Sequence, residues 1–161
     1  MNSIKTEIRS LIDSIKSLSF KETFIFISVA LITFVSMQYA SPNFFRRVFD
    51  TSDDKFFSVI YWFSADGFLM LIVPLILITL VLKGKPSEFG FRIGDWRFGL
   101  KSTVLFIAIM LPFVWVASAS ETFARTYPQA GPFVKENIGV LLYYELFVAF
   151  YMLAWEFFWR G

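Results

Sequence analysis

Four apolar stretches, each long enough to cross a lipid bilayer, constrain this chain more than any other feature. A membrane-spanning helix needs about 20 predominantly apolar residues, because each residue advances the helix by about 1.5 Å. The stretches cover about residues 23–40, 56–82, 102–120 and 138–158. Pro74 and Pro112 lie inside the second and third stretches, where neighbouring helices can satisfy the carbonyls that proline leaves unpaired. The sequence therefore predicts an all-α, polytopic membrane protein with four transmembrane helices.

The residues ahead of the first stretch predict a helix that lies on the membrane surface. Apolar residues recur there at spacings of three and four, with lysine and arginine between them, as in amphipathic interfacial helices. We expect residues 1–21 to form this cytoplasmic helix and residues 22–161 to form the transmembrane domain. A helix packed on the chain's own loops is the alternative. No cleavage pattern stands near Ala40, so we expect an uncleaved anchor.

Lysine and arginine outside the stretches predict the orientation. They are more numerous before residue 23 and in residues 83–101 than in residues 46–55 and 121–137. Because loops rich in these residues stay in the cytoplasm, we expect a cytoplasmic N terminus. Four spans then return the end of the fourth to the cytoplasmic side.

Composition limits the chemistry of any site. The chain contains no cysteine and no histidine, which excludes disulfides, thiolate nucleophiles, cysteine-ligated metals and a histidine base within these residues. Carboxylates remain as the credible catalytic side chains. The net charge of +2, without a basic stripe, excludes nucleic acid as a partner.

Three carboxylates lie inside the apolar stretches, although a charge at the bilayer centre costs about 2.5–3.5 kcal/mol. Asp66 precedes the fully apolar part of its stretch, and we expect it in a structural role near the outer interface. Glu145 and Glu156 are eleven residues apart, which places them on one helix face about 16 Å apart along the axis. We expect Glu145 to form a buried polar contact with another helix or to line a polar cavity.

Glu156 differs from Glu145 because Arg160 follows at the i+4 position. Residues at this spacing lie on the same helix face and can form an ion pair. The pair has two interpretations at this point. It either neutralises two charges at a helix end, or it holds Glu156 as a general base at the mouth of an intramembrane cavity.

The string "WEFFWRG", residues 155–161, resembles the first motif of the CPBP intramembrane proteases. This family includes the type II CAAX prenyl endopeptidases and the bacterial Abi proteins, and its motif reads E-E-x-x-x-R. Glu156 matches the second glutamate, and Arg160 and Gly161 complete the motif. Trp155 stands where the first glutamate is expected, the residue to which the family's mechanism assigns water activation. The upstream "FGFRIGDWRFGLK" is similar to the connection that precedes the core helices in bacterial members.

The resemblance implies an intramembrane hydrolase that cuts a protein or peptide substrate, prenylated in the CAAX type, near the cytoplasmic face. Glu156 and Arg160 would then be its catalytic residues. Further motifs, F-x-x-x-H and H-x-x-x-N, belong on later helices, so we expect these 161 residues to be about the first half of a larger bundle. The sequence leaves open whether the full-length protein binds a divalent metal such as zinc, because Glu156 would be at most one of its ligands.

A non-catalytic membrane protein on the same scaffold is the alternative. A bacteriocin self-immunity or assembly factor would need Glu156 and Arg160 only as structural residues. The tryptophan at position 155 favours this alternative. Cleavage of a peptide by the full-length protein distinguishes the two hypotheses.

Overall fold

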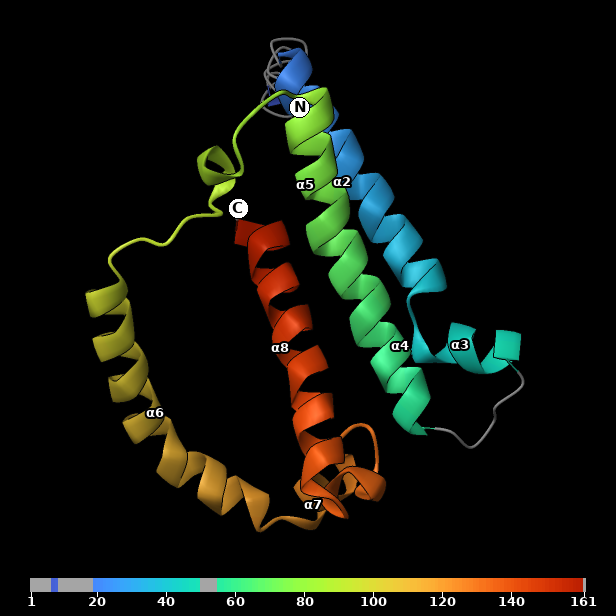
Figure 1. Cartoon of the computed structure of the whole chain (residues 1–161), viewed down its shortest axis with the longest axis vertical. Coiled ribbons are helices and arrows are strands. Elements are labelled where there is room, and N and C mark those ends of the chain that lie inside the picture. The colour runs from blue at the N-terminus through green and yellow to red at the C-terminus, as the bar shows by residue number, and fades with distance from the viewer. Residues whose placement is uncertain (1–6, 9–18, 50–54, 161) are drawn as a thin grey trace. The chain divides into compact units, whose positions relative to one another are not determined.

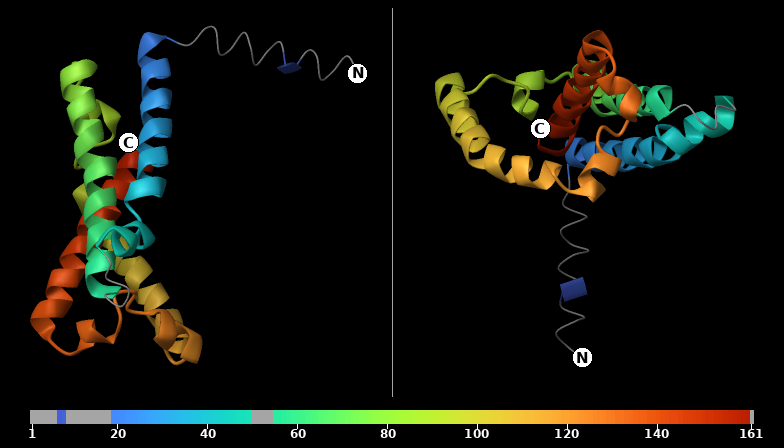
Figure 2. Two further views of the ribbon diagram at one scale, coloured as in Figure 1. Left: turned by 90° about the vertical axis from the view of Figure 1, so that its right-hand side faces the viewer. Right: turned by 90° about the horizontal axis from the view of Figure 1, so that it is seen from below.

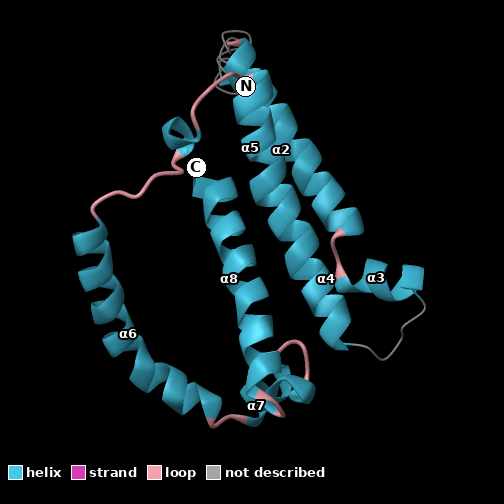
Figure 3. Cartoon of the chain, in the orientation of Figure 1, coloured by secondary structure: helices cyan, strands magenta, loops and turns pink. Residues whose placement is uncertain are grey.

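A computed structural model describes residues 7–8, 19–49 and 55–160, and this part of the chain contains helices and turns but no strand (Figure 1, Figure 3). The all-α prediction is confirmed for these residues. The chain divides into two compact units, Met1–Val35 and Ser36–Gly161. The surface helix expected over residues 1–21 lies largely outside the described residues, as does Gly161.

Among the described residues, four helices are long and apolar enough to cross a membrane, which fits an integral membrane protein. Each overlaps one of the four predicted stretches, and the largest difference is at the start of the third. That helix begins at Trp96 because the Asp95 carboxylate accepts hydrogen bonds from the backbone N–H groups of Arg97 and Phe98, both at 3.1 Å. The four helices are α2 (Phe20–Tyr39), Lys55–Val81, α6 (Trp96–Ser118) and α8 (Ile138–Arg160).

The second span is a continuous helix in which α-helical and π-helical segments alternate (Figure 2). It consists of α4 (Lys55–Gly67), η1 (Phe68–Ile72), α5 (Val73–Ile76) and η2 (Leu77–Val81). The segments η1 and η2 are π-helical and flank Pro74. Proline lacks the N–H group that an α-helix needs and crowds the preceding turn, and the wider π turns accommodate it without breaking the helix.

The core of the second unit forms where α8 packs along α4 and η1. The two helices come very close at Gly67, where an added Cβ would lie 2.3 Å from Cε1 of Phe150. Helices in a bilayer associate through such close packing because lipid is as apolar as the side chains. One buried cluster contains Val59, Ile60, Phe63, Ala130, Val134 and Tyr144. A second contains Met70, Leu71, Ile78, Ala154 and Phe157.

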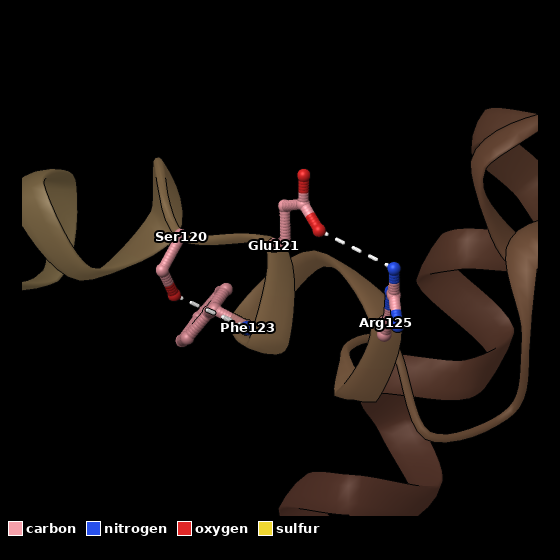
Figure 4. A network of polar contacts seen from close by, with 4 residues as sticks. All are labelled: Ser120, Glu121, Phe123 and Arg125. Carbon is pink, nitrogen blue, oxygen red and sulfur yellow. Dashed lines mark hydrogen bonds and ion pairs between the residues drawn. The ribbon is translucent and has the colours of Figure 1, made fainter.

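The loop between α6 and α8 contributes to this core. In the loop before α8, the short helix η4 (Pro132–Lys135) buries Val134 completely. The preceding helix α7 (Glu121–Thr126) begins where Ser120 Oγ accepts a hydrogen bond from Phe123 N–H at 3.2 Å (Figure 4). The connection between α6 and α8 therefore contains two short helices.

The helix α6 makes no comparable contribution to the core. None of its residues is buried by other parts of the described chain. Figure 1 shows α6 running between α7 and the loop that contains the short helix η3 (Pro86–Phe89), the two segments to which it is joined. Within the described residues, the packed part of the bundle is therefore α8 with the second span.

Candidate functional site

Glu156 and Arg160 form an ion pair in the last turns of α8. Nε of Arg160 lies 3.1 Å from Oε2 of Glu156, and their side chains are 75% and 48% exposed, respectively. The i+4 spacing therefore produces the contact that the sequence predicts. Exposure of both groups means that water screens the pair, so its contribution to stability is small.

The ion pair borders a cleft of about 410 Å³ in the second unit. This volume lies within the range of about 300–1,000 Å³ that is common for small-molecule sites. One wall is the end of α8, and the other is the loop before α6. The lining residues are Gly90, Phe91, Arg92, Ile93, Leu153, Glu156, Phe157 and Arg160.

The loop reaches α8 because of a turn that ends the short helix η3 (Pro86–Phe89). Gly90 follows with φ of +81°, a left-handed conformation that glycine adopts without strain. The N–H of Phe91 then donates to Pro86 O at 3.1 Å. The Phe91 ring meets the Phe157 ring edge-on, with centroids 5.3 Å apart, and so fixes the loop against α8.

Arg92 is a residue of this site that the sequence analysis does not identify. It lines the cleft, and its guanidinium makes no ion pair or hydrogen bond with the residues that the structure describes. The cleft therefore contains two guanidinium groups and one carboxylate. One feature of the sequence could have indicated Arg92. It lies between two large apolar residues, Phe91 and Ile93, just after the turn glycine Gly90.

Glu145 is exposed and does not line the cleft. It makes no hydrogen bond or ion pair with the described residues, so the expected buried contact is absent from this part of the chain. Glu145 and Glu156 nevertheless both lie on the exposed side of α8, opposite the buried Tyr144, Ala154 and Phe157.

Asp66 is also outside the cleft, in a buried hydrogen-bonded group. Its side chain is 5% exposed, and it lies near the middle of the 27-residue second span. Ser36 Oγ donates to Asp66 Oδ1 at 2.6 Å, and Trp62 Nε1 donates to Asp66 Oδ2 at 2.6 Å. These two hydrogen bonds are consistent with the structural role expected for Asp66, and its depth in the bilayer stays a prediction.

Trp155 does not line the cleft, although it precedes Glu156. Consecutive helical residues point about 100° apart, so a side chain at position 155 leaves the helix in another direction. A glutamate there would therefore not share the cleft with Glu156 in this arrangement.

The described residues do not form a metal site. No three carboxylates come together among them, and the chain contains no histidine or cysteine. Glu156 and Arg160 alone do not match the ligand sets of zinc, which takes three or four nitrogen, sulfur or oxygen ligands. The chemistry of the site therefore has to be derived from Glu156, Arg92 and Arg160.

Comparison of the chain with protein-family models, curated proteins and solved structures finds no match.

Proposed function

We propose that this chain forms part of an intramembrane endopeptidase of the CPBP type that hydrolyses a peptide bond near the cytoplasmic membrane face. The proposal rests on one observation about Glu156 and Arg160. Both residues match the family's motif, and both line one cleft at the end of a helix long enough to span a bilayer. The bilayer is the bacterial inner membrane in this proposal, and the substrate is a protein or peptide, prenylated in the CAAX type.

The ion pair supports a role for Glu156 in activating water. Arg160 holds Oε2, and Oε1 has no partner among the described residues. A water bound at Oε1 gives a proton to this carboxylate and its oxygen forms a bond to the peptide carbonyl carbon. The carbonyl oxygen becomes negatively charged and needs a donor, which is provided by a guanidinium of the cleft or by residues outside this chain. The C–N bond then breaks as the carbonyl double bond re-forms, and the proton passes from Glu156 to the leaving amine.

The apolar lining supports a membrane-associated substrate. Phe91, Ile93, Leu153 and Phe157 surround the charged groups, so an apolar segment can lie beside the reacting bond.

Peptide cleavage in proteoliposomes tests the proposal. The complete product of the reading frame that contains these residues is assayed with a quenched, farnesylated peptide. We expect Glu156→Gln to lower turnover at least about 100-fold, because it removes the general base. Arg160→Ala should lower turnover less, since it removes the group that orients Glu156.

A matched control uses the second ion pair of the same spacing. Glu121 pairs with Arg125 at 3.3 Å in α7, outside the cleft (Figure 4). Glu121→Gln removes the same chemical group from the same kind of pair and should leave turnover within twofold of the parent. Unchanged turnover in both Glu156→Gln and Arg160→Ala would contradict the assigned roles.

A non-catalytic protein on the same scaffold is the second candidate. It is favoured by Trp155, which provides no carboxylate where the motif has its first glutamate. In that case Glu156 and Arg160 form a surface ion pair of small energetic value. A complete reading-frame product that lacks peptide cleavage altogether would support this candidate.

The proposed orientation is tested by cysteine labelling. The chain has no cysteine, so a single introduced thiol is the only one present. Ser87 and Thr122 are exposed on the loops at opposite ends of α6. In intact cells an impermeant maleimide should label Thr122→Cys, and it should label Ser87→Cys only after the membrane is opened. The reverse pattern would place the cleft on the outer side.

A further inference from the structure

We propose that the cleft binds the phosphate group of an anionic phospholipid, with Arg92 as its main ligand. This inference goes beyond peptide hydrolysis and does not require it. Lipid binding is measured without turnover, so it can fail or succeed independently of the proposed enzymatic activity.

The charge of the lining favours an anion. Glu156 is already paired with Arg160 at 3.1 Å, which leaves the guanidinium of Arg92 without a counter-charge among the described residues. A guanidinium donates two parallel hydrogen bonds to phosphate oxygens. The lining therefore carries a net positive charge, which an anionic group neutralises.

The apolar part of the lining favours a lipid over a soluble anion. Ile93 is 88% exposed although it is a large apolar side chain in a loop, and it stands directly beside Arg92. Leu153 on the opposite wall is also largely exposed. A phospholipid matches both the charged and the apolar residues of the lining. Its phosphate contacts Arg92, and its acyl chains cover Ile93 and Leu153.

Two tryptophans near the cleft place it at headgroup level. Trp96 follows the lining loop and Trp159 precedes Arg160, and their side chains are 61% and 50% exposed. Exposed tryptophans are enriched where a membrane protein meets the headgroups. The phosphates of the bilayer lie at this level, so a lipid enters the cleft without leaving its leaflet.

Native mass spectrometry of the purified, detergent-solubilised protein tests the site. The protein is titrated with phosphatidylglycerol and, as the zwitterionic comparison, with phosphatidylcholine of the same acyl chains. We expect phosphatidylglycerol to bind at least about tenfold more tightly, and Arg92→Gln to weaken it about tenfold through the lost charge-assisted bonds. Arg92→Lys keeps the charge but loses the bidentate geometry, so it should weaken binding about threefold, less than Arg92→Gln, a pattern that unfolding would not produce.

Arg97→Gln is the matched control. Arg97 lies after the lining segment, does not line the cleft, and stacks 5.7 Å from the centroid of Trp96. Its removal lowers the net charge equally and should change phosphatidylglycerol affinity less than twofold. Equal losses for Arg92→Gln and Arg97→Gln would overturn the proposal, because they would indicate general attraction to a basic loop.

Two competitors distinguish other sources of the anion. Inorganic phosphate at low millimolar concentration should not displace phosphatidylglycerol, since it lacks the acyl chains. A peptide with a free terminal carboxylate should not displace it either. Displacement by phosphate would assign the cleft to a soluble anion, displacement by the peptide would assign it to a substrate, and either result would overturn lipid binding.

Discussion

Asp66→Ala is expected to lower the free energy of unfolding by about 2 kcal/mol. The substitution leaves the hydroxyl of Ser36 and the indole N–H of Trp62 without their shared acceptor inside the bundle. The bond from Ser36 joins two helices and the bond from Trp62 lies within α4. Each is worth about 1 kcal/mol, and a buried donor without an acceptor adds to this loss. Titration with sodium dodecyl sulfate in mixed micelles, followed by circular dichroism, measures the change.

Two further variants separate the hydrogen bonds of Asp66 from its volume. Asp66→Asn keeps the shape and one acceptor oxygen, so it should cost about half as much as alanine. Ser36→Ala removes one donor and leaves the bond from Trp62 in place. If Asp66→Asn and Asp66→Ala cost the same, the two hydrogen bonds do not determine the stability of this region.

Gly67→Ala is expected to destabilise the contact between α4 and α8 by about 2–3 kcal/mol, which is typical of an overpacked helix interface. The new Cβ would lie 2.3 Å from Cε1 and 2.6 Å from Cδ1 of Phe150. Phe150 packs against the buried cluster around Met70 and Ala154, so its ring moves only by giving up those contacts. The same titration in mixed micelles measures the loss.

The control and the rescue for Gly67→Ala use other residues of this chain. Gly99 in α6 has nothing within 4 Å of the added Cβ, and Gly99→Ala should be neutral or slightly stabilising. Combining Gly67→Ala with Phe150→Ala removes the clash, so the double variant should lose less than the sum of the two single losses. Additive losses would show that the two residues do not meet.

Features that depend on local sequence could be predicted. The four spans follow from the length of the apolar stretches, and the contact between Glu156 and Arg160 follows from their spacing on one helix. The start of α6 at Trp96 depends on the cap at Asp95, a signal that a hydropathy window does not contain. Local patterns therefore determine which segments are helical and give their ends within a few residues.

Features that depend on distant contacts could not be predicted. The buried position of Asp66 requires Ser36, which is 30 residues away in the sequence. The cleft requires Phe91 to meet Phe157, so Arg92 becomes a lining residue only when the loop folds onto α8. No periodicity within either segment contains this information.

The geometry of the cleft is expected to depend on the thickness of the bilayer, because no residue of α6 is buried within the described chain. With 23 residues, α6 is about 34 Å long, slightly more than a typical hydrocarbon core. A helix that is too long for its membrane tilts, and within the described chain no neighbour packs against α6 to oppose this. Because the lining loop is joined to the start of α6, we expect a change in bilayer thickness to displace the wall that carries Arg92 and Ile93.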